Sequence, residues 1–169
     1  MTTLVRKYNV PGPRYTSYPT VPYWDQETFS LKEWKATFKA SFLESNKREG
    51  ISLYIHLPFC ESMCTFCGCT KRITKNHSVE TPYIDAVLKE LALYRSFVGE
   101  RPVLQQVHLG GGTPTFFSEA NLARLINGIF KHADKAPQCE MSFEGHPNNT
   151  TLEHLETLAA FGFKRVCYG

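Results

Sequence analysis

A strand, a loop and a helix follow one another repeatedly from Ile51 onwards. The expected strands are short and apolar, and they cover residues 51–57, 103–109, 139–144 and 164–168. Helical periodicity fills the segments between them, at about 79–97, 118–132 and 150–162. Strands that alternate with helices pair in parallel, because each helix returns the chain across the sheet in a right-handed crossover. The pattern predicts an α/β fold with a parallel sheet of about four strands.

The first fifty residues have a different character. Residues 1–29 are rich in proline and aromatic side chains, which predicts an irregular arm. The capping box Ser30-Leu-Lys-Glu33 then predicts the start of an amphipathic helix over 31–45. We therefore expect two parts, an arm with its helix at 1–50 and the α/β part at 51–169.

Bulk composition excludes several classes of protein. A chain of 169 residues with 42% hydrophobic residues has the length and apolar content of one globular core. The net charge of +3 is too small to predict a nucleic-acid partner. No apolar run is long enough to cross a bilayer, so we expect no membrane association. Clustered cysteines without a secretory signal predict a location in the cytoplasm.

Four cysteines lie in the ten residues after the first expected strand, in the run Cys60-Glu-Ser-Met-Cys64-Thr-Phe-Cys67-Gly-Cys69. A cubic iron–sulfur cluster has four irons and commonly takes four cysteines. The C-x3-C-x2-C spacing supplies three thiolates from one tight loop, which would leave one iron open to a reactive ligand. Cys69 follows Cys67 so closely that we expect it not to bind the cluster.

Two other interpretations of these cysteines remain open. A structural zinc site is possible because zinc also binds clustered thiolates, and His56 and His77 could complete it. No second cysteine knuckle follows, which disfavours zinc. A disulfide framework is less favoured, because Cys139 and Cys167 stand singly in expected strands and are interpreted as buried thiols.

Three stretches carry a resemblance to a known family. The run Tyr54-Ile-His-Leu-Pro-Phe-Cys60, the cysteine loop, and Gly110-Gly-Gly-Thr-Pro-Thr115 resemble the radical S-adenosylmethionine superfamily. The stretch from Tyr8 to Thr20, together with Cys69 and the basic pair after it, is similar to the oxygen-independent coproporphyrinogen III oxidases. This resemblance implies a partial parallel (β/α) barrel of the radical SAM type, truncated here after about four strands. We therefore expect the chain to be a fragment of a longer protein.

The resemblance also implies cofactors and the residues that bind them. Cys60, Cys64 and Cys67 would hold a [4Fe-4S] cluster, and the open iron would bind S-adenosylmethionine. Gly111 would meet this first cofactor molecule, and Gly112 and Thr113 would reach a second one. The remaining cofactor-binding residues implied by the family are Tyr54, Phe66 and Glu144. Glu144 ends the third expected strand, where active-site residues of α/β barrels lie.

The implied activity is the oxidative decarboxylation of coproporphyrinogen III to protoporphyrinogen IX through a 5′-deoxyadenosyl radical. The implied partners are this tetrapyrrole and an electron donor such as flavodoxin or ferredoxin, and we expect a monomer. A haem chaperone of the same superfamily is the main alternative, and a zinc-stabilised interaction module is a weaker one. No residue can be given a catalytic role from the sequence.

Overall fold

The computed structural model describes residues 3–9, 20–25 and 27–168. Contacts divide the chain into two compact units, Met1–Ala36 and Thr37–Gly169. In the first unit, residues 3–8 form the short helix α1 (Thr3–Tyr8), which the expectation of an irregular arm did not include. Most of the proline-rich stretch, from Val10 to Pro19, lies outside the described residues. The predicted domain division at residue 50 stays a prediction.

Helix α2 (Leu31–Arg48) begins where the sequence predicts, because the hydroxyl of Ser30 accepts a hydrogen bond from the backbone N–H of Glu33. It runs beyond the predicted end at residue 45. Asn46 explains this extension, since its side chain accepts from the N–H of Val103 at 2.7 Å and donates to the carbonyl of Arg101 at 2.9 Å. These bonds connect the last turn of α2 to the segment that begins the second strand of the main sheet, at Val103.

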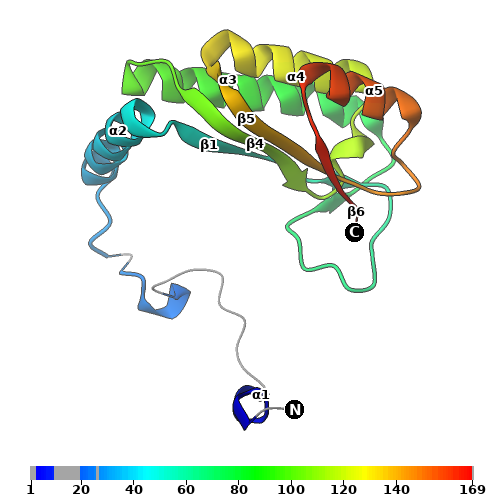
Figure 1. The fold of residues 1–169 in the computed structure, drawn as a ribbon, viewed down its shortest axis with the longest axis horizontal. Coiled ribbons are helices and arrows are strands. Elements are labelled where there is room, and N and C mark those ends of the chain that lie inside the picture. Colours follow the sequence, from blue (N-terminus) through cyan, green and yellow to red (C-terminus); the bar gives the residue numbers. More distant parts are fainter. Residues whose placement is uncertain (1–2, 10–19, 26, 169) are drawn as a thin grey trace. The chain divides into compact units, whose positions relative to one another are not determined.

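The second unit is built on a sheet of four parallel strands (Figure 1). The strands are β1 (Ile51–Leu57), β4 (Val103–Gly111), β5 (Asp134–Gly145) and β6 (Arg165–Tyr168), in the order β1-β4-β5-β6. All three neighbouring pairs are parallel, which confirms the predicted fold class. β5 begins five residues before the predicted strand, because Asp134 and Lys135 already pair with Val103 and Leu104 ahead of a register shift.

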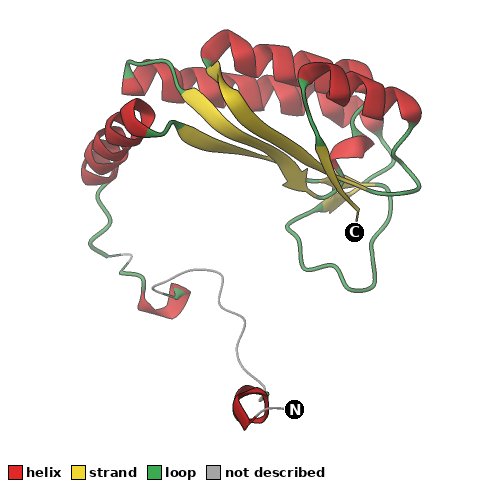
Figure 2. Ribbon diagram, in the orientation of Figure 1, coloured by secondary structure: helices red, strands yellow, loops and turns green. Residues whose placement is uncertain are grey.

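Three helices cover one face of this sheet (Figures 1 and 2). They are α3 (Glu80–Val98), α4 (Glu119–His132) and α5 (Leu152–Phe161). In β1, β4 and β5, the odd-numbered apolar residues toward the carboxyl ends are buried under these helices, together with apolar residues of α4; the main members are Leu57, Val107, Leu109, Leu122, Leu125, Ile126, Ile129 and Phe143. Each such side chain contributes about 1.5–3 kcal/mol by leaving water. Among the described helices, none combines the length and the apolarity that a membrane crossing needs.

The start of α5 differs from its prediction by one residue. Thr150 and Glu153 have the spacing of a capping box in the sequence, but the cap is formed by Thr151 and His154. The His154 side chain replaces the expected carboxylate, accepting from the N–H of Thr151 at 3.1 Å. The Thr150 hydroxyl donates instead to the carbonyl of His146 at 2.9 Å.

The opposite face of the sheet carries polar rows that cross the strands. One row is Ser52, Gln106 and Glu140, and the next is Tyr54, His108, Ser142 and Arg165. Parallel sheets covered by helices on both faces have apolar side chains on both. A polar second face is instead what the interior of an open barrel with a ligand site would present. Cys167, on edge strand β6, is exposed, so its interpretation as a buried thiol was wrong.

Candidate metal and cofactor site at the carboxyl ends of the strands

The cysteine loop leaves the sheet at the carboxyl end of β1 and is closed by a small second sheet. Its strands, β2 (Phe59–Cys60) and β3 (Arg72–Ile73), pair in parallel. The N–H of Arg72 donates to the backbone carbonyl of Pro58 at 2.8 Å, and the N–H of Thr74 donates to the backbone carbonyl of Cys60 at 2.9 Å. This closure was not predicted, because strands of two residues leave no periodic signal. It fixes both ends of the segment that contains Cys64 and Cys67.

Cys60 is the buried member of the cysteine group, with 9% of its surface exposed. Its sulfur accepts a hydrogen bond from the Thr113 hydroxyl at 3.3 Å. A Cβ on Gly112 would lie 2.8 Å from this sulfur and 2.7 Å from the carbonyl oxygen of Pro58, so only glycine fits there. Burial raises the pKa of the Cys60 thiol, and the Thr113 hydroxyl opposes that rise.

The segment from Gly110 to Thr115, which we call the glycine loop, is placed by backbone hydrogen bonds to β1 and β2. The N–H of Gly112 donates to the carbonyl of Leu57 at 2.9 Å. The N–H of Thr113 donates to the carbonyl of Phe59 at 3.0 Å. Because these bonds extend the β1–β4 pairing past the end of the main sheet, the glycine loop and the first cysteine are brought together.

The other cysteines are more accessible. Cys64 and Cys67 are partly exposed, and the N–H of Cys67 donates to the carbonyl of Cys64 at 3.2 Å in a turn between them. The backbone N–H of Cys69 lowers the pKa of Cys67, whereas burial and the nearby Cys67 raise the pKa of Cys69. Phe66 lies in this turn with 79% of its surface exposed. In the described part of the chain, no three metal-ligand side chains converge closely enough to hold an ion as they stand.

A second group of predicted residues meets at Gly111. The carboxylate of Glu144, near the end of β5, accepts a hydrogen bond from the Gly111 N–H at 3.0 Å. Gly111 has φ of 118°, and a Cβ there would lie 2.9 Å from the His56 ring. Any other residue would therefore be strained and would collide with the histidine. These contacts connect the glycine loop to β5 at the carboxyl ends of the strands.

Two histidines also belong to this group: His56, considered from the sequence as a possible zinc ligand, and His108, which the sequence analysis did not single out. The Tyr54 ring stacks on His108 with centroids 5.8 Å apart, and its hydroxyl lies 3.1 Å from His56 Nδ1. His56 Nε2 lies 2.8 Å from the carbonyl of Thr70 in the cysteine loop. His108 Nε2 lies 3.6 Å from Glu144. Burial, with a smaller contribution from the charge of Glu144, raises the pKa of Tyr54. These histidines have even numbers, as Tyr54 and Glu144 do, and residues two apart in a strand lie on the same face of the sheet. This spacing was the sequence signal that the side chains share a face.

A third histidine fastens the beginning of the cysteine loop. His77 stacks on Phe116 with ring centroids 4.3 Å apart, while its two nitrogens contact Glu80 at 2.7 Å and Glu61 at 3.2 Å. Glu80 is 3% exposed and also accepts from Ser118 at the start of α4. The sequence treated His77 as a possible zinc ligand, but both of its nitrogens are engaged by carboxylates.

The donor set fits an iron–sulfur group. Thiolates are the ligands such clusters take, and three of them occupy one loop with both ends fastened. The first of these, Cys60, is fixed by packing, and Cys64 and Cys67 remain accessible on the loop. The missing side chains of Gly111 and Gly112 let the glycine loop pack closely against His56, Pro58 and Cys60, which brings this loop to the first cysteine.

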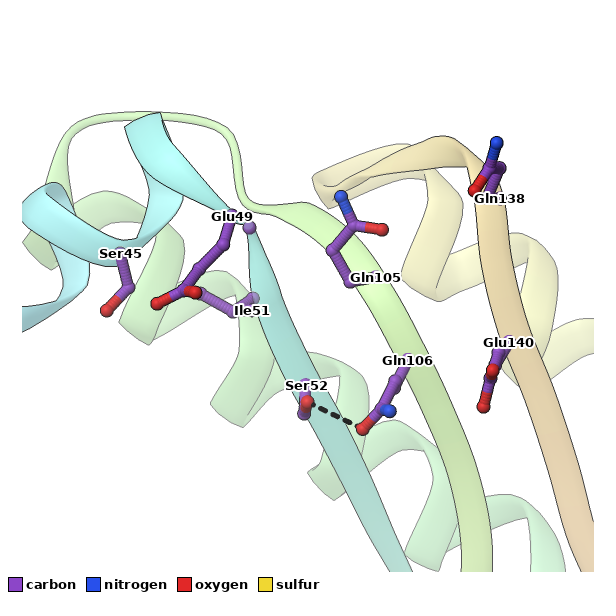
Figure 3. A pocket seen from close by; sticks show the side chains of 9 residues that line it. Ser45, Glu49, Ile51, Ser52, Gln105, Gln106, Gln138 and Glu140 are labelled. Carbon is purple, nitrogen blue, oxygen red and sulfur yellow. Dashed lines mark hydrogen bonds between the residues drawn. The ribbon is translucent and has the colours of Figure 1, made fainter.

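A separate cavity lies away from this edge. It has a volume of about 550 Å³ and opens near the amino-terminal ends of β1 and β4, with polar lining (Figure 3). Ser52 donates to Gln106 across the two strands at 2.9 Å, and Glu140 lies on the neighbouring strand (Figure 3). Active sites of parallel α/β barrels form at the carboxyl ends of strands. We therefore locate the candidate site at the cysteines, where the chemistry-bearing groups gather, and not in this cavity.

Comparisons with known proteins identify relatives of the chain. No protein-family model matches it. Oxygen-independent coproporphyrinogen III oxidase from Salmonella typhimurium is 36% identical over 169 residues, which is 98% of this chain and 35% of that protein. The protein of the same name from Helicobacter pylori strain 26695 is 40% identical over 168 residues, covering 96% of this chain and 35% of its own length.

A solved structure shares the fold. Coproporphyrinogen III oxidase (HemN) from Escherichia coli, described as a radical SAM enzyme, matches with a TM-score of 0.79 and 31% sequence identity. The match covers 98% of this chain and 35% of that one. The chain thus spans about a third of the length of the curated relatives it matches. In sequence and in fold, the chain is similar to oxygen-independent coproporphyrinogen III oxidases and corresponds to about a third of their length.

Proposed function

We propose that the protein containing this chain is a radical SAM oxidoreductase that converts coproporphyrinogen III to protoporphyrinogen IX. The observation that carries the proposal is the meeting of Cys60 with Gly112 and Thr113 at the carboxyl edge of the sheet. This contact joins the cysteine loop to the glycine loop, which are the two motifs shared with the superfamily. Identities of 36% and 40% with enzymes of that name support the same substrate class.

In this proposal, Cys60, Cys64 and Cys67 bind three irons of a [4Fe-4S] cluster. The cluster and S-adenosylmethionine, when bound, supply the one-electron chemistry that the protein side chains lack. Cys60 gives a rigid first attachment, because its loop start packs through Phe59 against Tyr83, with ring centroids 5.3 Å apart. Cys64 and Cys67 lie on the more accessible turn, where a cluster can be assembled from solvent.

The same proposal gives the neighbouring residues the tasks of binding and orienting the cofactor. Gly111 would meet the first molecule of S-adenosylmethionine, and Gly112 would reach a second one. Glu144 already accepts from the Gly111 N–H and has a second carboxylate oxygen for donors of the cofactor. Tyr54 and Phe66 would pack against it, and Thr113 would reach a second molecule of S-adenosylmethionine.

The substrate and partners of the whole protein also belong to this proposal. The reaction takes one hydrogen atom, carbon dioxide and one electron from each of two propionate side chains, which leaves two vinyl groups. S-adenosylmethionine would be the oxidant, and a flavodoxin or ferredoxin would supply the electron that starts its cleavage; the electron released by the substrate offsets the one supplied. We infer that the protein acts as a monomer in the cytoplasm. Free thiols at all six cysteines in the described chain are in keeping with a reducing compartment.

The test is an anaerobic assay of the full-length protein. After reconstitution with iron and sulfide, it should convert coproporphyrinogen III to protoporphyrinogen IX only when S-adenosylmethionine and a reductant are both present. Cys64→Ala should abolish turnover, whereas Cys139→Ala, at a partly buried position in β5 outside the cysteine loop, should leave it intact. Haem binding without product would indicate a haem chaperone. Zinc without iron or sulfide in anaerobically purified protein would indicate a zinc-stabilised module, and either result would overturn the proposal.

A further inference from the structure

One hydrogen bond joins a side-chain hydroxyl to a proposed cluster ligand inside the protein. The Thr113 Oγ1 lies 3.3 Å from the Cys60 sulfur, within the range for a hydrogen bond to sulfur. Both residues are buried, with exposed fractions of 8% and 9%. Water therefore does not compete for this bond as it would at the surface, and the lower local dielectric strengthens it.

The chain places both atoms by backbone contacts, so the bond does not depend on a flexible side chain. The N–H of Thr113 donates to the carbonyl of Phe59, the residue before Cys60, at 3.0 Å. Glycine at position 112 allows the two segments to approach, since a Cβ there would contact the same sulfur at 2.8 Å. The hydroxyl and the sulfur are thus held together by the backbone contact between Thr113 and β2.

The direction of the bond follows from the chemistry of the two groups. A cysteine that ligates iron is a thiolate and has no proton to donate. The threonine hydroxyl must then be the donor, which is the direction found here. Hydrogen bonds to ligand sulfurs are among the levers by which proteins set the reduction potential of iron–sulfur clusters.

We propose that the Thr113 hydroxyl raises the reduction potential of the cluster by donating a hydrogen bond to the Cys60 sulfur. The proposal rests on the proposed function, since it requires the cluster to be held by Cys60. It adds to Thr113 a role that acts on the cluster itself, apart from any contact with S-adenosylmethionine. Reduction adds negative charge to the cluster, and a donor at its sulfur stabilises the reduced form more than the oxidised one.

Two substitutions separate the hydroxyl from the rest of the side chain. Thr113→Val replaces it with a methyl group of similar shape, and Thr113→Ser keeps it. Thr113→Ala is a third variant, which removes the hydroxyl without placing an additional methyl group against the sulfur. Among the described residues, this is the one hydrogen bond that the Thr113 hydroxyl makes, so the valine variant leaves other pairs intact.

The experiment is an equilibrium redox titration of the reconstituted full-length protein, followed by the EPR signal of the reduced cluster. S-adenosylmethionine is left out, so that a lost contact with the cofactor cannot move the result. We expect the valine and alanine variants to be harder to reduce than the wild type by up to roughly tenfold in the equilibrium constant, which is about 59 mV for one electron. The serine variant should stay close to the wild type.

The outcomes are distinguishable from those of the proposed function. Iron and sulfide analysis first establishes whether the wild type and each variant contain the cluster. If all contain it and all have the same potential, the role of Thr113 is overturned while the proposed function stands. If the wild type assembles no cluster, both fall. A serine variant that shifts as much as valine would also overturn the role, because the hydroxyl would not be what matters.

Discussion

The imidazole of His77 donates through Nδ1 to the carboxylate of Glu80, 2.7 Å away. Its other nitrogen lies 3.2 Å from a second carboxylate, that of Glu61, which follows the first cysteine of the loop. A neutral imidazole has one N–H, so only the charged ring can donate to both carboxylates. His77 thus joins the start of the cysteine loop to Glu80, a buried acid that begins α3 and accepts from Ser118 at the start of α4.

This arrangement predicts a pH-dependent stability. The hydrogen bond that His77 donates to Glu80 is the largest cause of a raised pKa for His77, above its usual 6.5. A raised pKa means that the folded state favours the proton, so the added stability is complete below pH 6.5 and is lost as pH rises through the raised value. His77→Gln should cost about 1 kcal/mol in the free energy of unfolding near pH 6, because the ring is half exposed and solvent screens the charge.

The measurement is denaturant unfolding of wild type and variant at a series of pH values. The difference between the two free energies should shrink as pH rises. A difference that stays constant from roughly pH 5 to 9 would show that the charge of His77 contributes nothing.

Glu80 should matter more for stability than its position on a helix surface would suggest. Its carboxylate is 3% exposed and accepts from the N–H of Ser118 at 2.9 Å and from the Asn121 amide at 2.7 Å. Glu80→Ala would leave these buried donors at the start of α4 without an acceptor, at a cost of about 2–4 kcal/mol.

Glu119→Ala is the control, because Glu119 lies in the first turn of α4, close to the donors that Glu80 accepts from, but is exposed. It should cost only about 0.3–1 kcal/mol through the lost interaction with the helix dipole. Thermal or denaturant unfolding of both variants measures the contrast, and equal costs would contradict the buried role of Glu80.

Gly111→Ala should weaken the binding of S-adenosylmethionine without preventing cluster assembly. The added Cβ would lie 2.9 Å from the His56 ring, at a φ of 118° that side chains rarely adopt. Gly99→Ala is the control, since Gly99 also has a positive φ, of 85°, but a Cβ there meets nothing within 4 Å. Equilibrium binding of the cofactor should weaken at least several-fold in the first variant and stay unchanged in the second. Equal affinities in both would disprove the close approach at Gly111.

The cysteines should divide into ligands and a bystander. Cys60→Ala, Cys64→Ala and Cys67→Ala should each lose the visible absorbance of the cluster after anaerobic reconstitution, because one iron loses its thiolate. Cys69→Ala should keep it. The Cys69 variant is the internal control, since it removes a thiol from the same loop. If all four variants bleach alike, three-thiolate ligation is wrong.

Much of the fold could be predicted because its signals are local. Helical periodicity predicted a helix at about 118–132, and α4 spans Glu119–His132 with Ser118 as its N-cap. The alternation of strands and helices predicted the parallel order of the sheet. The cap of α5 was misplaced, because His154 performs a task for which the sequence pattern considers only glutamate or glutamine.

The site was predictable in its motifs and not in its connections. Cys60 and Gly112 are far apart in the sequence, and neither residue type indicates that they touch. The tie between His77 and Glu61 and the contact of His56 with Thr70 depend on how the loop folds back onto the sheet. Such contacts are tertiary. They cannot be predicted from a single sequence that has no periodic pattern at these positions.

The central claim is that one iron lacks a protein ligand and binds the sulfonium cofactor. The most direct measurement is the EPR spectrum of the reduced, reconstituted full-length protein before and after addition of S-adenosylmethionine, with the cofactor labelled by ¹⁷O or ¹⁵N at its amino acid end. The account predicts a changed signal with coupling from the labelled atoms to the cluster. An unchanged signal, without such coupling, would contradict it.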